Sequence, residues 1–208
     1  MIIEPDSAGF PNVYKVMVGS IVPRPIAFVS TVSPEGIFNL APFSFFTAAS
    51  MNPPVVCFCP LRKANGRPKD TLNNIEHTGE FVVNIVSEEF IRQVNTTSAE
   101  FPADVDEFQV SGLTPVPGDL VKAPRVKESH VSMECRLFRI FEISNKPSGG
   151  SIVTGEIVRL HVDDAYIENY QIDPGKLKAV GRMAGATYVR TADRFDLVRP
   201  TVSESTGR

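Results

Sequence analysis

The stretch that decides the fold is residues 22–46, which read VPRPIAFVSTVSPEGIFNLAPFSFF. Apolar and β-branched side chains in residues 25–32 indicate a strand, and the turn at residues 33–36 ends it. Residues 37–46 follow as the partner strand of a hairpin. Pro42 lies within that partner and cannot donate a ladder hydrogen bond, so the strand is predicted to be interrupted or to lie at a sheet edge.

The rest of the chain carries further strands and only two helices. The first helix begins near Asp70 and ends at Gly79, and the second covers residues 87–94. Alternating or apolar runs predict strands at residues 55–59, 81–86, 131–137 (continued with a change of phase at 140–143) and 151–162. About six strands with two helices predict a mainly β, closed antiparallel barrel. We expect one domain over residues 1–208, with a flexible polar tail at about 201–208.

Composition excludes several classes of protein. The net charge is −3, and no basic run appears, which argues against a nucleic-acid partner. No apolar run approaches the ~20 residues that a membrane span requires. The three cysteines are an odd number, and the N-terminal residues lack the basic and apolar regions of a signal peptide. These features predict a cytoplasmic protein without a membrane partner.

Common catalytic motifs are absent from the sequence. There is no G-x-S-x-G, P-loop or G-x-G-x-x-G pattern, and the three histidines lie far apart, so no metal site is expected. Cys57 and Cys59 are two residues apart on a strand, where their Cα atoms are ~6.6 Å apart, an awkward distance for a disulfide. We interpret them as buried small side chains rather than redox partners.

Two segments suit a cofactor with a flat ring and a phosphate. Residues 39–46 combine an amide, a hydroxyl and aromatic rings around a proline break, where exposed backbone groups suit a heteroaromatic ring. The alternative is a core strand with a bend. Residues 69–71, Lys-Asp-Thr, open the first helix, whose free N–H groups suit a phosphate. The alternative is that Asp70 and Thr71 are ordinary capping residues.

Taken in order, these segments resemble the flavin reductase-like, FMN-binding split-barrel family over about residues 14–191. The motifs that carry the resemblance are residues 22–31, the turn at Gly36, and residues 39–46, 52–54, 69–75, 79–86, 155–158, 161–164 and 181–188. The resemblance implies a six-stranded antiparallel split barrel. It also implies a homodimer with FMN near the subunit interface.

The resemblance also assigns roles to individual residues. It implies that Ser30, Thr31, Asn39, Ala41, Pro42 and Ser44 line the flavin, and that Phe45 and Phe46 pack against the ring or the interface. It places the phosphate at Lys69, Asp70 and Thr71, with Arg62 as a second candidate cation. Arg182 and Tyr188 approach from the substrate side, either from this chain or from its partner. No side chain is expected to act as a catalytic acid or base, because the chemistry takes place on the flavin.

The implied function is a flavin reductase that passes electrons from NAD(P)H through FMN to a second acceptor. Many nicotinamide-using relatives carry an Asp-His pair where this sequence has Gly149 and Gly150. That departure favours a flavoredoxin-like carrier that takes electrons from a redox protein partner. A third alternative is a flavin-free structural barrel dimer. The sequence leaves open NADH or NADPH, the acceptor, a partner monooxygenase, and whether FMN is cofactor or substrate.

Overall fold

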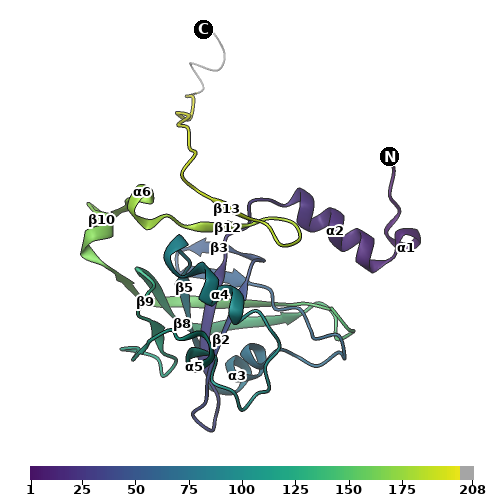
Figure 1. Cartoon of the computed structure of the whole chain (residues 1–208), viewed down its shortest axis with the longest axis horizontal. Coiled ribbons are helices and arrows are strands. Elements are labelled where there is room, and N and C mark those ends of the chain that lie inside the picture. The colour runs from purple at the N-terminus through teal and green to yellow at the C-terminus, as the bar shows by residue number, and fades with distance from the viewer. Residues whose placement is uncertain (202–208) are drawn as a thin grey trace.

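One antiparallel sheet organises the chain in the computed structural model, which describes residues 1–201 (Figure 1). The seven strands lie in the order β2-β1-β5-β8-β9-β4-β3. Their bounds are β1 Ala27–Val32, β2 Phe38–Phe43, β3 Phe46–Met51, β4 Pro54–Phe58, β5 Glu80–Ile85, β8 Val131–Glu142 and β9 Ser151–Val162. The mainly β prediction is therefore confirmed. The predicted tail falls almost entirely on residues 202–208, which lie outside the described part of the chain.

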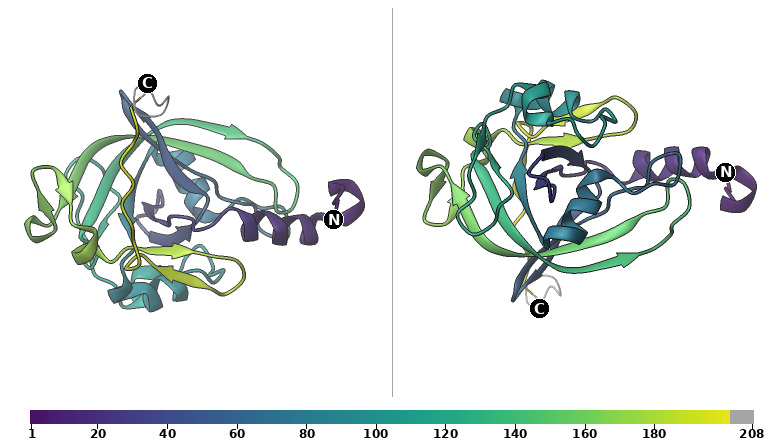
Figure 2. Two further views of the ribbon diagram at one scale, coloured as in Figure 1. Left: turned by 90° about the horizontal axis from the view of Figure 1, so that it is seen from above. Right: turned by 90° about the horizontal axis from the view of Figure 1, so that it is seen from below.

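The predictions of six strands and of a closed barrel are wrong. Strands β2 and β3 are the two edges of the sheet, and no ladder joins them in the described chain. Only Ser44 and Phe45 separate these two edges along the sequence, so the sheet curves round on itself (Figure 2). The missed strand is β3, whose residues Thr47–Ser50 are small or polar and carry no apolar signal.

The predicted hairpin is confirmed. Phe28 pairs with Pro42 across the β1–β2 ladder, and Ser33 N donates to Ile37 O at 2.8 Å. Gly36 closes the turn with a φ of +88°, a left-handed conformation that glycine adopts readily. Because β2 is an edge strand, Pro42 leaves no ladder bond unmade, and the strand continues through it to Phe43.

Hydrophobic cores lie on both sides of β1, which explains why all six of its residues are buried. The inner core is enclosed by the curved sheet and α3, and it comprises Ala27, Val29, Phe43, Val56, Phe58, Leu72, Ile75, Phe81, Val83, Cys135 and Val153. The outer core includes Ile26, Phe28, Leu40, Val86, Phe90, Val94, Phe108, Leu113, Val126 and Val180. Burial on both faces removes the alternation that a half-exposed strand would show.

Helix α3 (Asp70–Thr78) ends as predicted at Gly79, whose φ of +71° is left-handed. Its N-cap is Lys69 rather than Asp70, and no side chain caps it. The second predicted helix is split into a 3₁₀ turn, Glu88–Phe90, and α4, Ile91–Thr96. A further short helix, α5 (Glu107–Ser111), begins after Asp106, whose carboxylate accepts a hydrogen bond from Phe108 N. Helices α4 and α5 both contact β2.

The remaining elements are short. Helices α1 (Pro5–Ala8) and α2 (Phe10–Ser20) project from the body, as do residues 191–201 after β13 (Figure 1). The small ribbons pair β6 (Pro115–Val116) with β7 (Arg125–Val126), β10 (Ile167–Glu168) with β11 (Gln171–Ile172), and β12 (Val180–Arg182) with β13 (Tyr188–Arg190). A 3₁₀ turn, Asp164–Tyr166, precedes β10, and α6 (Pro174–Leu177) precedes β12.

The proline-rich loop at residues 114–124 packs on the sheet of its own chain. Glu134 on β8 is fully buried, and its carboxylate accepts hydrogen bonds from the backbone N of Asp119, Leu120 and Val121 at 2.6–3.0 Å. His161 lies within hydrogen-bond distance of the same carboxylate. The change of phase within β8 comes from irregular register at Glu134/Cys135 and at Leu137/Arg139.

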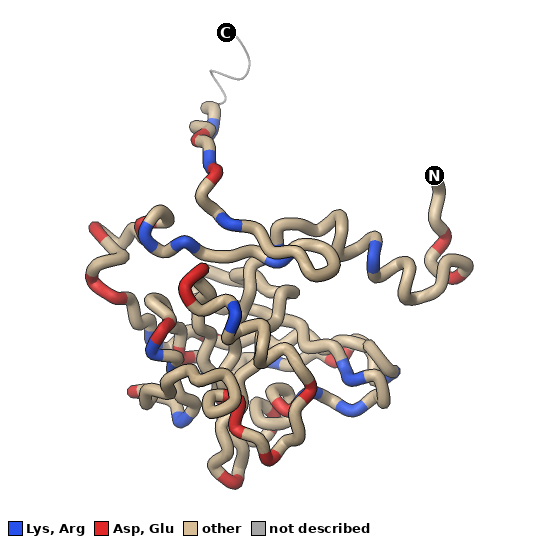
Figure 3. The backbone as a smooth tube through the Cα atoms, in the orientation of Figure 1, with Lys and Arg blue, Asp and Glu red and all other residues tan. Residues whose placement is uncertain are grey.

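The prediction that Cys57 and Cys59 are buried, unpaired side chains is confirmed in part. All three cysteines are free, but only Cys135 is fully buried, while Cys57 and Cys59 are half-buried. Acidic and basic residues alternate over the backbone without a large region of one sign (Figure 3). Within residues 1–201, no helix is long and apolar enough to cross a membrane.

Candidate functional site

A groove with three adjoining pockets surrounds Pro42 at the end of β2. The Asn39 pocket is lined by Asn39, Ala41, Pro42, Phe43, Lys63, Lys69, Asp70, Thr71, Thr97, Ser98, Ala99, Glu100, Phe101 and Glu107. The Arg62 pocket, of about 450 Å³, is lined by Phe10, Tyr14, Pro42, Phe43, Ser44, Phe45, Cys59, Leu61, Arg62, Lys69 and Ser148. The Tyr188 pocket is lined by Ile26, Pro42, Ser44, Val94, Asn95, Ser98, Arg182 and Tyr188. Pro42 lines all three pockets, so they adjoin one another round this residue, and we call the three together the groove.

Most residues assigned from the sequence line this groove. Asn39, Ala41, Pro42, Ser44, Phe45, Arg62, Lys69, Asp70, Thr71, Arg182 and Tyr188 each line at least one of the three pockets. Ser30, Thr31 and Phe46 line none of them. The buried Ser30 hydroxyl donates to the carbonyl of Pro124 and accepts from Asn84, and Phe46 packs against the inner core.

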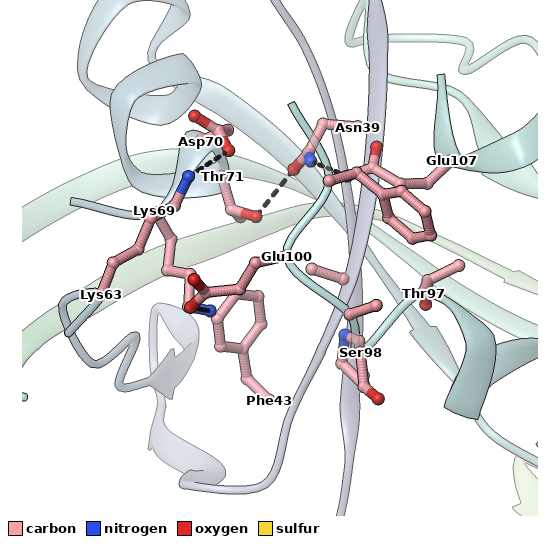
Figure 4. Close-up of a pocket in the computed structure, with 14 residues that line it drawn as sticks. Asn39, Phe43, Lys63, Lys69, Asp70, Thr71, Thr97, Ser98, Glu100 and Glu107 are labelled. Atoms are coloured by element: carbon pink, nitrogen blue, oxygen red, sulfur yellow. Dashed lines mark hydrogen bonds and ion pairs between the residues drawn. The ribbon is translucent and has the colours of Figure 1, made fainter. Parts of the chain in front are cut away.

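Asn39 is held in one orientation by buried hydroxyl groups. Its Oδ1 accepts a hydrogen bond from Thr71 at 2.7 Å (Figure 4). It accepts a second one from Thr31 at 3.3 Å. Asn74 on α3 in turn donates to the Thr31 hydroxyl at 2.9 Å. Thr31 therefore orients Asn39 from the interior and does not line the pocket itself. Because both lone pairs of Asn39 Oδ1 are used, its amide faces the pocket only as a hydrogen-bond donor.

Two lysines line the Asn39 pocket, and each has a carboxylate partner. Lys69 Nζ lies 2.9 Å from Glu100 Oε1, and Lys63 Nζ lies 2.9 Å from Asp70 Oδ2 (Figure 4). The hydrogen bond from Lys69 lowers the pKa of Glu100. The ion pair with Lys63 shows that Asp70 does not cap α3, so the free N–H groups of the first turn remain available to an anion.

Arg62 contributes a buried donor to the second pocket. Its guanidinium pairs with Glu142 and donates to Gly66 O at 3.2 Å, while its buried Nε has no hydrogen-bond partner within the described residues. A buried donor without a partner is costly unless a ligand or water satisfies it. Arg62 therefore fits an acceptor group bound in the Arg62 pocket.

Arg24 ties the elements round the groove together. It is buried, and its guanidinium donates to the carbonyls of Val18, Ile21 and Met183 and to the hydroxyl of Ser44 at 3.3 Å. Burial is the main cause that lowers the pKa of Arg24. The sequence motif contained Arg24, but only the fold shows that it positions Ser44.

The C-terminal motif reaches the groove within the same chain. Arg182 exchanges backbone hydrogen bonds with Arg24 at 2.8 and 3.0 Å, and its guanidinium lies 4.5 Å from the centroid of the Tyr188 ring. The Tyr188 hydroxyl donates to Asn95 Oδ1 at 3.2 Å. A partner subunit is therefore not needed to place Arg182 and Tyr188 beside Pro42.

Lys63 and Glu107 are site residues that sequence reasoning missed. Glu107 is 6% exposed, and it comes from α5 to accept a hydrogen bond from Asn39 Nδ2 at 2.8 Å. Burial is the largest cause that raises the pKa of Glu107 to about 7. No local signal distinguishes this glutamate from an ordinary residue in the first turn of a helix, where acidic residues are common.

One group of metal-ligating side chains occurs in the described residues, away from the groove. The ligand atoms of Asp119, Glu134 and His161 lie within 4.8 Å of one another. Glu134 already accepts three backbone N–H groups, and Asp119 pairs with Arg159 at 2.7 Å. Protein donors thus satisfy these carboxylates, and the group holds the loop at residues 117–124 to the sheet.

Comparison with known proteins places the chain in a family. The flavin reductase like domain matches residues 18–194. An uncharacterized protein of Halalkalibacterium halodurans is 36% identical over 207 residues, 99% of each chain. Nitrilotriacetate monooxygenase component B from Bacillus cereus is 36% identical, with a TM-score of 0.91 over 95% of this chain and 98% of that one. The 2-nitrobenzoate 2-nitroreductase of Pseudomonas fluorescens is 29% identical, with a TM-score of 0.87 over 97% and 98%. The chain therefore belongs to the flavin reductase like domain family.

Proposed function

We propose that this protein is an FMN-binding oxidoreductase that passes electrons from NAD(P)H through FMN to a second acceptor. The observation that carries the proposal is the connection, at Pro42, of two complementary pockets. The Asn39 pocket has cations and a helix N-terminus, while the larger Arg62 pocket has aromatic walls. Membership of the flavin reductase like domain family and the likeness to a monooxygenase component and a nitroreductase support the same reaction class.

The residues present fit the phosphate of FMN in the Asn39 pocket. Helix α3 has nine residues, and its first-turn N–H groups, Lys69 and Lys63 would attract a phosphate there. Among the described residues Lys69 pairs with Glu100, and its side chain is 30% exposed. An ion pair that is this exposed contributes little free energy. A phosphate can therefore replace Glu100 as the partner of Lys69 at low cost.

The ring of the flavin fits the part of the groove beyond Pro42. The Arg62 pocket has a volume within the usual range for small-molecule sites, and Phe43, Phe45 and Tyr14 supply its apolar walls. When bound, the flavin supplies the hydride and electron chemistry. The protein binds and orients it: Asn39 presents an N–H donor, Arg62 Nε offers a second one, and Arg24 holds Ser44 in place.

A fluorescence titration of the purified protein with FMN and with riboflavin tests the proposal. We expect saturable binding that is tighter for FMN. Anaerobic mixing of the FMN-loaded protein with NADH, and separately with NADPH, should then bleach the flavin absorption. Absence of FMN binding by the folded protein would contradict the whole proposal. Binding without reduction by either nicotinamide would leave the cofactor assignment and refute the reductase.

A flavoredoxin-like electron carrier is the second candidate, and the loop at Gly149 favours it. A Cβ at Gly149 would collide with the carbonyl of Ser144 and would lie 2.8 Å from the carbonyl of Lys146. The loop therefore has no room for a side chain at Gly149, the first of the two positions at which nicotinamide-using relatives carry their Asp-His pair. The anaerobic experiment separates the two candidates, because a carrier would be reduced by a redox protein and not by nicotinamide.

We also propose that the protein is a homodimer. Phe45 and Phe46, which were expected to pack against the ring or the interface, have contacts within the chain, since Phe45 lines the Arg62 pocket and Phe46 packs on the inner core. Helix α2 instead presents Phe10, Tyr14 and Met17, each at least 40% exposed. Such a patch beside a ligand groove is typical of an interface. Sedimentation velocity should show a dimer, and a monomer at all concentrations would contradict it.

A further inference from the structure

The buried carboxylate of Glu107 forms one wall of the Asn39 pocket. Its side chain reaches from α5 to the edge strand β2, where Oε1 accepts from Asn39 Nδ2 at 2.8 Å and Oε2 accepts from Leu40 N at 3.1 Å. Figure 4 shows Glu107 beside Asn39 and across the pocket from Lys69 and Asp70. The same carboxylate thus touches both the edge strand and the space in which we place the phosphate.

The charges that line this pocket do not favour an anion when all are ionised. The pocket has two ammonium groups, Lys63 and Lys69, and three carboxylates, Asp70, Glu100 and Glu107. When all five are ionised, the net charge of the lining is therefore −1. Asp70 and Glu100 each have a lysine partner at 2.9 Å. Glu107 has no ion-pair partner among residues 1–201. A phosphate dianion would therefore meet one uncompensated carboxylate.

The elements packed against Glu107 bring no other compensating charge. Strand β2 contributes only Asn39 and Leu40 to its contacts. Arg92 is the one charged residue of α4, and it is exposed. At the start of α5, the helix that carries Glu107, the carboxylate of Asp106 accepts a hydrogen bond from Phe108 N. Burial, with a smaller contribution from the negative charge of Asp70, raises the pKa of Glu107 to about 7. The pKa of Glu107 thus lies near neutral pH.

We propose that Glu107 determines the specificity of the Asn39 pocket for a phosphate-bearing flavin, because the phosphate binds together with a proton that Glu107 takes up. This inference rests on the proposed FMN site. Protonation removes the uncompensated charge and turns one oxygen of the carboxyl from an acceptor into a donor. If the proton resides on Oε1, Asn39 Nδ2 loses its partner, while Thr31 and Thr71 still hold Oδ1.

Proton linkage provides a direct test that does not use activity. FMN binding is measured by isothermal titration calorimetry at about pH 7.5 in phosphate-free buffers of different ionisation enthalpy, with riboflavin as the ligand that lacks the charge. We expect uptake of roughly half to one proton with FMN and none with riboflavin. From about pH 7 to about pH 8.5, where the phosphate of FMN stays dianionic, FMN affinity should fall ~4–10-fold and riboflavin affinity should stay level.

Two variants separate Glu107 from the rest of the pocket. Glu107→Gln should abolish the proton uptake and flatten the pH dependence for FMN. Glu100→Gln removes a carboxylate that is already paired with Lys69, so it is the matched control and should leave proton uptake unchanged. Glu107→Gln places an amide NH2 group beside two N–H donors, which disfavours folding of the variant. A second measurement therefore does not depend on the variant and uses the wild type. Its infrared difference spectrum should show a protonated carboxyl band that appears when FMN is added.

The outcomes distinguish this inference from the proposed function. FMN binding without proton uptake, or uptake that persists in Glu107→Gln, refutes the role of Glu107 and leaves the FMN site intact. A wild-type spectrum without a new protonated carboxyl band also refutes it. Absence of FMN binding to the folded wild type overturns the site and, with it, this inference.

Discussion

The hydroxyl of Thr71 donates a hydrogen bond of 2.7 Å to Oδ1 of Asn39, which joins the first turn of α3 to the edge strand β2. Both side chains are more than 90% buried. The bond therefore fixes the first turn of α3 relative to strand β2. It also means that the Thr71 hydroxyl already has an acceptor before any ligand binds.

Replacing Thr71 by the isosteric Val should weaken FMN and riboflavin by a similar factor. The variant loses the Asn39 hydrogen bond, so the free energy of unfolding should fall by ~1 kcal/mol. Chemical denaturation and fluorescence titration with both flavins measure the two effects, and Thr71→Ser, which keeps the hydroxyl, is the control. A loss confined to FMN would instead show that Thr71 contacts the phosphate directly.

Replacing Lys69 by Ala should weaken FMN by ~10–100-fold, because a charge-assisted hydrogen bond to the phosphate is lost. Riboflavin has no phosphate, so its affinity should change little. The same titration on Lys127→Ala controls for the loss of one positive charge, since Lys127 is exposed and does not line the groove. Equal losses for both flavins would place the phosphate elsewhere, and Arg62→Ala would be the next variant.

Replacing Gly155 by Ala should lower the free energy of unfolding by ~1–3 kcal/mol. A Cβ at Gly155 on β9 would collide with Cζ of Phe81 and would lie 2.7 Å from its Cε1, and Phe81 is fully buried in the inner core. Thermal or urea denaturation measures the effect. Gly19→Ala in α2, where no atom lies within 4 Å of the new Cβ, should not destabilise the protein. The double variant Gly155→Ala, Phe81→Leu should recover part of the lost stability, because leucine has no ring to collide with the new Cβ.

His130 should stabilise the fold more at low pH than at high pH. Burial disfavours its charged form, but hydrogen bonds to Asp163 at 2.8 Å and to Glu89 at 3.2 Å outweigh burial and raise the pKa of His130. A raised pKa adds stability below the unfolded value, and that stability disappears as the pH rises through the folded value.

The measurement compares urea denaturation of the wild type and of His130→Gln at about pH 6 and at about pH 9. The stability difference between the wild type and the variant should be larger at the lower pH, by a few tenths to about 1 kcal/mol. Asp163→Asn should reduce the same pH dependence. An identical stability difference at both pH values would contradict the charged pair.

Local signals in the sequence determined the hairpin, α3 and most of the groove. The turn at Gly36 and the proline of β2 predicted an edge hairpin, and Gly79 ended α3 where expected. The order of motifs identified the family and the residues that line the groove. These features depend on backbone preferences of a few neighbouring residues, so they can be recognised without knowing which distant segments they meet.

The tertiary structure decided the rest. Strand β3 carries no apolar pattern, because an edge strand of small residues is defined by its partner β4 rather than by a buried face of its own. Glu107 became a site residue only when α5 packed on β2, and Lys63 only when the loop before α3 folded back on that helix. Ser30 does not line the groove, because its buried hydroxyl is hydrogen-bonded to Asn84 and to the carbonyl of Pro124. The pairing partner of a buried polar group sets its role, and residues far apart in sequence supply that partner only after the chain has folded.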